Sequence, residues 1–216
     1  MLKNLIYTFK NKEILKIVLK PFLISILVSG VLIFLLSFLL YPFMKLILAI
    51  PFINNLLSGI SFNSIMAYIF YQLTIMITSI VNAFFVEEIV RKLNDTFYKL
   101  PIKNTSIIEA IIWSLKGIGI FILIFPFTFF LLFIPFINIL YQLFLWSILN
   151  KKSLIYDASS MFCKVKDVEK NLNKKIWILV FVSSVIYFIP VLNIFGYTFQ
   201  LILLTHFILI YCKKGN

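Results

Sequence analysis

The sequence predicts an all-α integral membrane protein, and its composition and its long charge-free stretches are the observations behind this prediction. Of its 216 residues, 62% are hydrophobic and 13% are charged, with a mean hydropathy of +1.06. Soluble domains contain roughly 45–50% apolar and about 25% charged residues, so this chain has too little polar surface for water. Its apolar surface must therefore face lipid, where helices satisfy their own backbone hydrogen bonds.

Four charge-free stretches define the main elements: Pro21–Met44, Leu46–Val86, Gly117–Asn150 and Ile176–Cys212. All lysines and arginines except Lys45 lie at the chain ends or in the gaps that follow Val86 and Asn150, and the positive-inside rule places these segments in the cytoplasm. We therefore expect one domain, residues 1–216, in a bacterial inner (plasma) membrane with both termini cytoplasmic. The net charge of +12 is explained by basic loops beside anionic lipid, so we expect no nucleic-acid partner.

The first half of the chain predicts an ordinary pair of full transmembrane helices, residues 21–44 and 62–98. Each contains the ~20 apolar residues that a membrane span needs. Before them, residues 1–20 mix five lysines with apolar side chains, which predicts an amphipathic helix lying in the membrane interface. Lys16 and Lys20 are alternatively candidates for binding an anion at a cytoplasmic mouth.

The third and fourth charge-free stretches fit poorly as simple spans. A single span over Gly117–Asn150 would place the lysine-rich loop after it outside the cell, and two spans would leave 15 residues for the second. Both conflicts disappear if each stretch turns back to the cytoplasm. We therefore predict two re-entrant (hemi-penetrating) helical hairpins, residues 104–150 and 170–212. Turns at membrane depth must be buried in protein or line a polar cavity, which predicts a homo-oligomer or a polar pathway.

The pattern Ile-Pro-x-x-Asn occurs three times, at Ile50–Asn54, Ile134–Asn138 and Ile189–Asn193. Proline removes a backbone donor and disfavours helix for the residue before it, so a helix ends there and the next begins. Pro135 and Pro190 therefore predict the turns of the two hairpins.

Polar residues continue from the two hairpin turns at helical spacing, namely Asn138 and Gln142, then Asn193, Tyr197 and Gln200. The two asparagines have two interpretations. They are either local caps of the turns, or part of a substrate pathway between broken helices, as in transporters. In the second interpretation all five residues line the pathway.

Five other residues have side chains that could serve a chemical or structural role. The lone histidine, His206, fits either a packed neutral side chain or a pathway residue. Ser106 and Glu109 have the spacing of a helix capping box. Cys163 and Cys212 lie at cytoplasmic edges, where thiols stay reduced, so we expect no disulfide.

Several short segments resemble the etoposide-induced-protein-like (CysZ sulfate permease-like) membrane protein family, from about Glu13 onward. They are Ile189–Asn193, Ile134-Pro135, Ser153–Asp157 and Leu19-Lys20-Pro21. The resemblance implies two spanning helices, two hemi-penetrating hairpins, cytoplasmic termini, oligomers, and passive uptake of sulfate or sulfite.

One segment departs from the sulfate permeases of that family, which carry a glycine followed by paired arginines before the first span. Here the corresponding residues are Glu13-Ile14-Leu15-Lys16. Arginine binds tetrahedral oxyanions through two parallel donors, whereas lysine offers a point charge. The substrate is therefore left open between sulfate and other small solutes.

The sequence favours an inner-membrane permease or channel that moves a small solute passively, with an inorganic anion such as sulfate as the candidate. The alternative is a membrane scaffold or assembly protein whose hairpins pack against a partner. Because no nucleophile–base pair, phosphate loop or metal-ligand spacing is present, we expect no enzyme, no cofactor and no metal.

Overall fold

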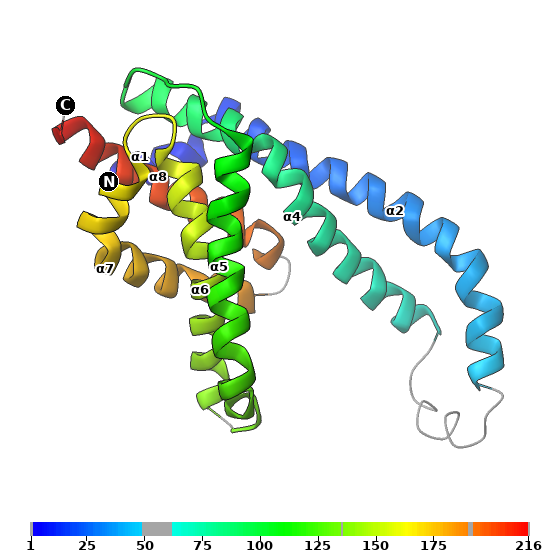
Figure 1. Cartoon of the computed structure of the whole chain (residues 1–216). Helices are drawn as coiled ribbons and strands as arrows, with labels where there is room; N and C mark the ends of the chain where they lie inside the picture. The colour runs from blue at the N-terminus through cyan, green and yellow to red at the C-terminus, as the bar shows by residue number, and fades with distance from the viewer. Residues whose placement is uncertain (1, 49–61, 135, 190–191, 216) are drawn as a thin grey trace. The chain divides into compact units, whose positions relative to one another are not determined.

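The computed structural model describes residues 2–48, 62–134, 136–189 and 192–215 (Figure 1). All regular secondary structure in this part of the chain is helical. Contacts within the chain group its residues into two compact units, and the single domain stays a prediction. The first unit is Met1–Val18 with Phe85–Asn216, and the second is Leu19–Phe84.

The N-terminal segment breaks at Asn11, which separates α1 (Leu2–Lys10) from α2 (Lys12–Leu48). The Oδ1 atom of Asn11 accepts hydrogen bonds from the backbone N–H groups two and three residues later, at 2.9 and 3.3 Å. This is an N-cap, so a new helix begins after Asn11 and continues without interruption. The boundary that we predicted at residue 20 therefore falls inside α2.

The second unit contains most of α2 and the first part of α4 (Phe62–Phe97). Helix α4 as a whole ends close to the predicted limit at residue 98. Its buried hydroxyl side chains each donate to the carbonyl four residues earlier, at 2.5–2.8 Å: Ser25, Ser29, Thr74 and Thr78. These polar groups are thus satisfied within their own helices, as small residues of membrane helices are. The predicted outer turn at Ile50–Asn54 lies outside the described residues.

The first unit contains a helical hairpin made of α5 (Ile107–Thr128), η1 (Phe129–Phe133) and α6 (Ile137–Ser159), with α5 and α6 packed together. The helix begins where the capping box predicts, because Ser106 Oγ accepts from the N–H of Glu109 at 3.4 Å. The second limb, α6, runs past the predicted end at residue 150.

A second hairpin in the same unit is made of α7 (Val165–Ser183), η2 (Ser184–Phe188), η3 (Leu192–Phe195) and α8 (Gly196–Gly215). Its limits lie close to the predicted 170–212. In Figure 1 both chain ends lie near α8 and α1, within this first unit.

The two hairpin turns share one backbone geometry. The N–H of Asn138 donates to the carbonyl of Ile134 at 3.0 Å, and the N–H of Asn193 donates to the carbonyl of Ile189 at 3.0 Å. The two isoleucines have nearly identical extended dihedrals, −94° and 114° against −93° and 112°. The isoleucine and the asparagine of the repeated sequence therefore have the same backbone arrangement in both hairpins.

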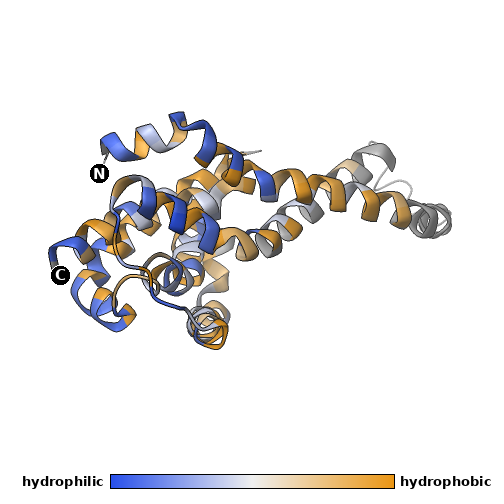
Figure 2. Ribbon diagram, turned by 90° about the horizontal axis from the view of Figure 1, so that it is seen from above, coloured by the Kyte–Doolittle hydropathy of each residue, from blue (hydrophilic) through white to orange (hydrophobic). Residues whose placement is uncertain are grey.

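Three apolar helical segments among the described residues are long enough to cross a membrane: Lys12–Leu35, Ile107–Leu131 and Leu192–Lys214. Figure 2 shows hydrophilic residues gathered near both chain ends and hydrophobic residues along the long helices. The middle segment is longer than the predicted hairpin limb because the apolar residues before Gly117 continue the same helix. That the hairpins are re-entrant stays a prediction.

The expectation of no disulfide is wrong. Cys163 and Cys212 form a disulfide, with their Cα atoms 6.0 Å apart. The two residues are separated by 49 positions, and sequence distance alone does not show that the loop after α6 folds against the end of α8. This link joins the two hairpins.

His206 is fully buried, and both of its ring nitrogens are hydrogen-bonded. Its Nδ1 lies 2.7 Å from the Tyr98 hydroxyl and its Nε2 lies 2.8 Å from Thr8 Oγ1. The three residues come from α8, the end of α4 and α1, so His206 fixes these segments together. The geometry supports the packed interpretation of this histidine.

Candidate functional site

The side chain of Gln200, on α8, is the centre of a buried polar network between the hairpins. It is fully buried, and its Nε2 donates to the Val180 carbonyl at 3.1 Å. The same amide group lies 3.2 Å from Ser183 Oγ and 3.0 Å from Ser184 Oγ. Because a buried amide is costly unless it is hydrogen-bonded, these partners explain how Gln200 is tolerated in an apolar interior.

The side-chain oxygen of Gln200 connects residues of α6 and η2 to the same network. Its Oε1 accepts from the Tyr187 hydroxyl at 3.1 Å and from Asn150 Nδ2 at 3.3 Å. Asn150 also donates to the Tyr187 hydroxyl at 2.9 Å. Three segments that are distant in sequence are thus linked by one glutamine.

The position of Tyr187 depends on a glycine. A Cβ atom on Gly196 would lie 2.3 Å from the Tyr187 ring, so only glycine lets the ring lie against the start of α8. On its other side the ring stacks on Trp146, with centroids 4.9 Å apart. These contacts hold the Tyr187 hydroxyl at the network.

A second group of polar side chains lies one turn nearer the C-terminal end of α6. The Tyr197 hydroxyl donates to Asp157 Oδ2 and lies 2.8 Å from Ser153 Oγ, which also donates to Asp157 at 3.3 Å. Asp157 lies outside the candidate membrane spans. Burial raises the pKa of Asp157 to about 6, although both hydrogen bonds favour the charged form.

We call these residues the polar network: Ser147, Asn150, Ser153, Asp157, Ser183, Ser184, Tyr187, Tyr197 and Gln200. Its α6 members recur every three or four residues and therefore share one helix face. The sequence named two members of the network, Tyr197 and Gln200, as pathway residues. It ended the α6 limb at residue 150, before Ser153 and Asp157. The regular spacing of polar residues through Asp157 is the signal that could have found the rest of this face.

Of the predicted pathway residues, Tyr197 and Gln200 belong to the polar network. Asn138 and Gln142 instead bond to each other, with Gln142 Nε2 2.5 Å from Asn138 Oδ1, one turn apart at the start of α6. They form a separate polar pair near the first hairpin turn.

Asn193 behaves differently from either group. Its Oδ1 is buried and has no hydrogen-bond partner within the described part of the chain. The turn itself is closed by the backbone N–H of Asn193, not by its side chain. The cap interpretation therefore lacks support here, and an orphaned buried acceptor calls for another explanation, such as a water or a ligand.

The other predicted residues do not join the network. Lys16 is exposed on α2 in the first unit, and Lys20 belongs to the second unit. Pro135 and Pro190 lie outside the described residues. Across the described ranges, no cluster of three or more His, Cys, Asp or Glu side chains could hold a metal ion.

Comparison with known proteins agrees with the resemblance seen in the motifs. A family profile described as Sulfate transporter CysZ/Etoposide-induced protein 2.4 matches residues 1–197. No curated protein and no solved structure matches the chain. Because the profile covers most of its length, the chain belongs to the Sulfate transporter CysZ/Etoposide-induced protein 2.4 family.

Proposed function

We propose that this protein is a passive permease for a small inorganic oxyanion, with the polar network as its pathway. Two findings support the proposal. The chain belongs to a family of membrane proteins of the sulfate-transporter type, and the network places hydroxyl and amide groups inside an otherwise apolar hairpin pair. The network is the observation that carries the proposal.

The chemistry of the network suits weak, reversible binding of an oxyanion. Its donors are neutral side chains of serine, tyrosine, asparagine and glutamine, which can replace part of the hydration shell of an oxyanion without holding it as a fixed cation would. Conduction requires binding strong enough to admit the solute and weak enough to release it. We therefore propose that no energy source and no catalysed reaction is involved.

The orphaned Asn193 side chain extends this pathway toward the second hairpin turn. An amide can rotate so that either its NH₂ group or its oxygen faces a passing solute. In our proposal, Asn193 binds water or solute during passage, and a homo-oligomer shields the turns from lipid.

The experiment is anion flux into liposomes that contain the purified protein. We expect radiolabelled sulfate or sulfite to enter faster than into empty liposomes, with phosphate and chloride as comparison anions. Gln200→Leu should reduce this flux at least tenfold, while Gln142→Leu, outside the network, serves as the matched control.

Two outcomes would overturn the proposal. The absence of flux above empty liposomes for every anion would favour the scaffold alternative, which predicts a co-purifying partner protein instead. Equal loss of flux in both glutamine variants would show that the network is not the pathway.

A further inference from the structure

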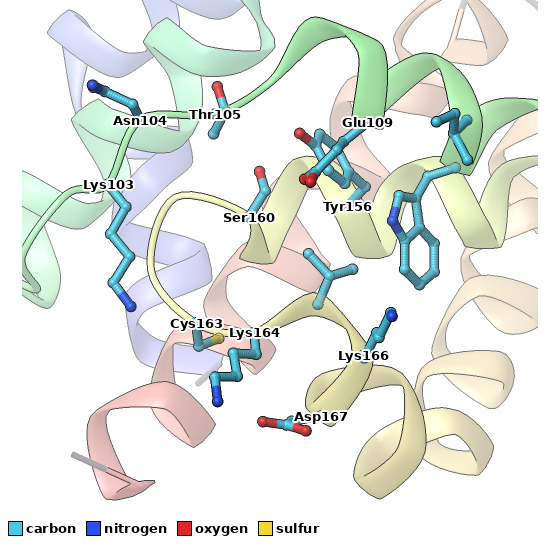
Figure 3. A pocket seen from close by; sticks show the side chains of 13 residues that line it. Lys103, Asn104, Thr105, Glu109, Tyr156, Ser160, Cys163, Lys164, Lys166 and Asp167 are labelled. Carbon is cyan, nitrogen blue, oxygen red and sulfur yellow. The ribbon is translucent and has the colours of Figure 1, made fainter.

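A pocket of about 460 Å³ lies outside the polar network, at the end of the first unit where α5 begins (Figure 3). The connection before α5, the end of α6 and the start of α7 form its walls. None of the residues of the polar network lines it. The pocket is therefore separate from the polar network.

The walls of this pocket are held by hydrogen bonds within the protein. The N–H of Lys103 donates to the Met161 carbonyl at 2.8 Å, which joins the connection before α5 to the loop after α6. The Tyr156 hydroxyl donates to the Ser106 carbonyl at 2.7 Å, beside the first turn of α5. The pocket is thus preformed, as small-molecule sites usually are.

The pocket carries charges of both signs. Three lysines line it, Lys103, Lys164 and Lys166, together with the carboxylates of Glu109 and Asp167 (Figure 3). The ion pairs found in the described part of the chain involve other residues. A ligand with one negative and one positive group would match this lining better than a simple anion.

The pocket also adjoins an apolar surface. The candidate membrane span of α5 begins at Ile107, so the pocket lies at the polar end of a lipid-facing helix. Ile112, which lines the pocket, is 46% exposed, and Ile108, one turn before it on α5, is 70% exposed. Trp113 also lines the pocket, and tryptophan is enriched at the level of lipid headgroups.

We propose that this pocket binds the headgroup of a zwitterionic phospholipid of the phosphoethanolamine type. The phosphate binds among the lysines, of which Lys164 and Lys166 lie at the start of α7, and the primary ammonium binds at Glu109 on α5. The acyl chains lie along the exposed isoleucines of α5. Basic pockets beside cytoplasmic helix ends bind lipid headgroups, and the carboxylate of Glu109 selects for a headgroup that also carries a hydrogen-bonding cation.

The test uses the natural tryptophan in the pocket as a reporter. Trp146→Phe and Trp177→Phe leave Trp113 as the sole tryptophan. The detergent-solubilised protein is titrated with lipids that carry brominated, fluorescence-quenching acyl chains. We expect phosphatidylethanolamine to quench Trp113 at a several-fold lower concentration than phosphatidylcholine, which lacks ammonium N–H donors, or phosphatidylglycerol, which lacks the ammonium.

Charge variants locate the binding site. Because exposed ion pairs contribute modestly, we expect the combined Lys103→Gln, Lys164→Gln and Lys166→Gln variant to raise the half-quenching concentration about tenfold. The matched control is Lys213→Gln with Lys214→Gln, at the exposed end of α8, and it should leave quenching unchanged.

Three results would contradict the proposal. One is equal quenching by the three lipids, and another is an equal loss in the control variant. The third is displacement of the brominated lipid by an equal concentration of inorganic phosphate, which would assign the pocket to a free oxyanion. Water-soluble glycerophosphoethanolamine should compete only at much higher concentration, because it lacks acyl chains.

Discussion

The two hairpins of the first unit have the same turn but different interiors. In the α5–α6 hairpin, 11% of the most apolar window of the candidate span Ile107–Leu131 is buried. The corresponding share is 56% for the span Leu192–Lys214, which contains α8. The polar pair near the first turn, Asn138 and Gln142, is bonded only within α6. Polar residues of the second hairpin, in contrast, bond across to α6 and form most of the network.

This difference shows that the turn and the site have separate causes. The turn follows from the local Ile-Pro-x-x-Asn sequence, because proline ends one helix wherever it occurs. The network depends instead on which helix faces another. Substitutions at matched positions in the two hairpins can therefore separate local from tertiary effects.

The largest expected effect is that of Gln200→Leu. The substitution leaves Ser183, Ser184 and Tyr187 without their amide partner in a buried region, and each such loss costs roughly 1–3 kcal/mol. We expect the free energy of unfolding in detergent to fall by about 3 kcal/mol, measured by denaturant titration.

The matched change in the first hairpin is Gln142→Leu, which removes one bond within a single helix. Its cost should stay below about 1 kcal/mol. If Gln142→Leu and Gln200→Leu lower the free energy of unfolding equally, the buried network does not stabilise the second hairpin more than the polar pair stabilises the first.

The next effect is that of Gly196→Ala. The added Cβ would overlap the Tyr187 ring, which must then move away from the network. Overpacking of this kind costs about 1–3 kcal/mol, and thermal unfolding should show a lowered midpoint. Gly119→Ala is the control in α5, because nothing lies within 4 Å of its Cβ position. That change should leave stability unchanged or raise it slightly.

A smaller effect concerns pH and Asp157. Burial raises its pKa from 3.8 to about 6 in the folded protein. Between these values the folded state holds more protons than the unfolded state, so the stability contributed at low pH is lost as pH rises toward 6. We expect Asp157→Asn to remove this slope, and to be more stable than the wild type at pH 7 by about 1–2 kcal/mol after allowance for partial exposure. Parallel pH profiles of the two proteins would refute the assignment.

Sequence reasoning predicted the helical class and the start of α5 at Ser106, because these follow from composition and local spacing. It did not predict the break at Asn11, although asparagine is a preferred N-cap residue and Glu13 follows it in the first turn of α2. The disulfide between Cys163 and Cys212 was out of reach, since it depends on how the hairpins pack.

The sequence predicted only part of the polar network, because spacing along one helix is local whereas contact between helices is not. Tyr197 and Gln200 were named from their spacing along α8. Their partners, such as Asn150 and Asp157, were not named, because a row of polar residues on one helix does not show which other helix it contacts. Contact between helices is a tertiary property, and a single sequence carries no measure of it.

Asn193→Ala should change stability the least. It is also the sharpest test of whether the second hairpin turn takes part in transport. Its Oδ1 is buried without a partner, so deleting the amide removes an unsatisfied group and should leave stability unchanged or raise it by up to ~1 kcal/mol. Anion flux should nevertheless fall, because the group that meets the solute is gone. Asn138→Ala, which loses the bond to Gln142, should cost about 0.5 kcal/mol with a smaller effect on flux. A clear loss of stability in Asn193→Ala with flux intact would instead establish the asparagine as a structural cap, and the orphaned oxygen would then have no part in transport.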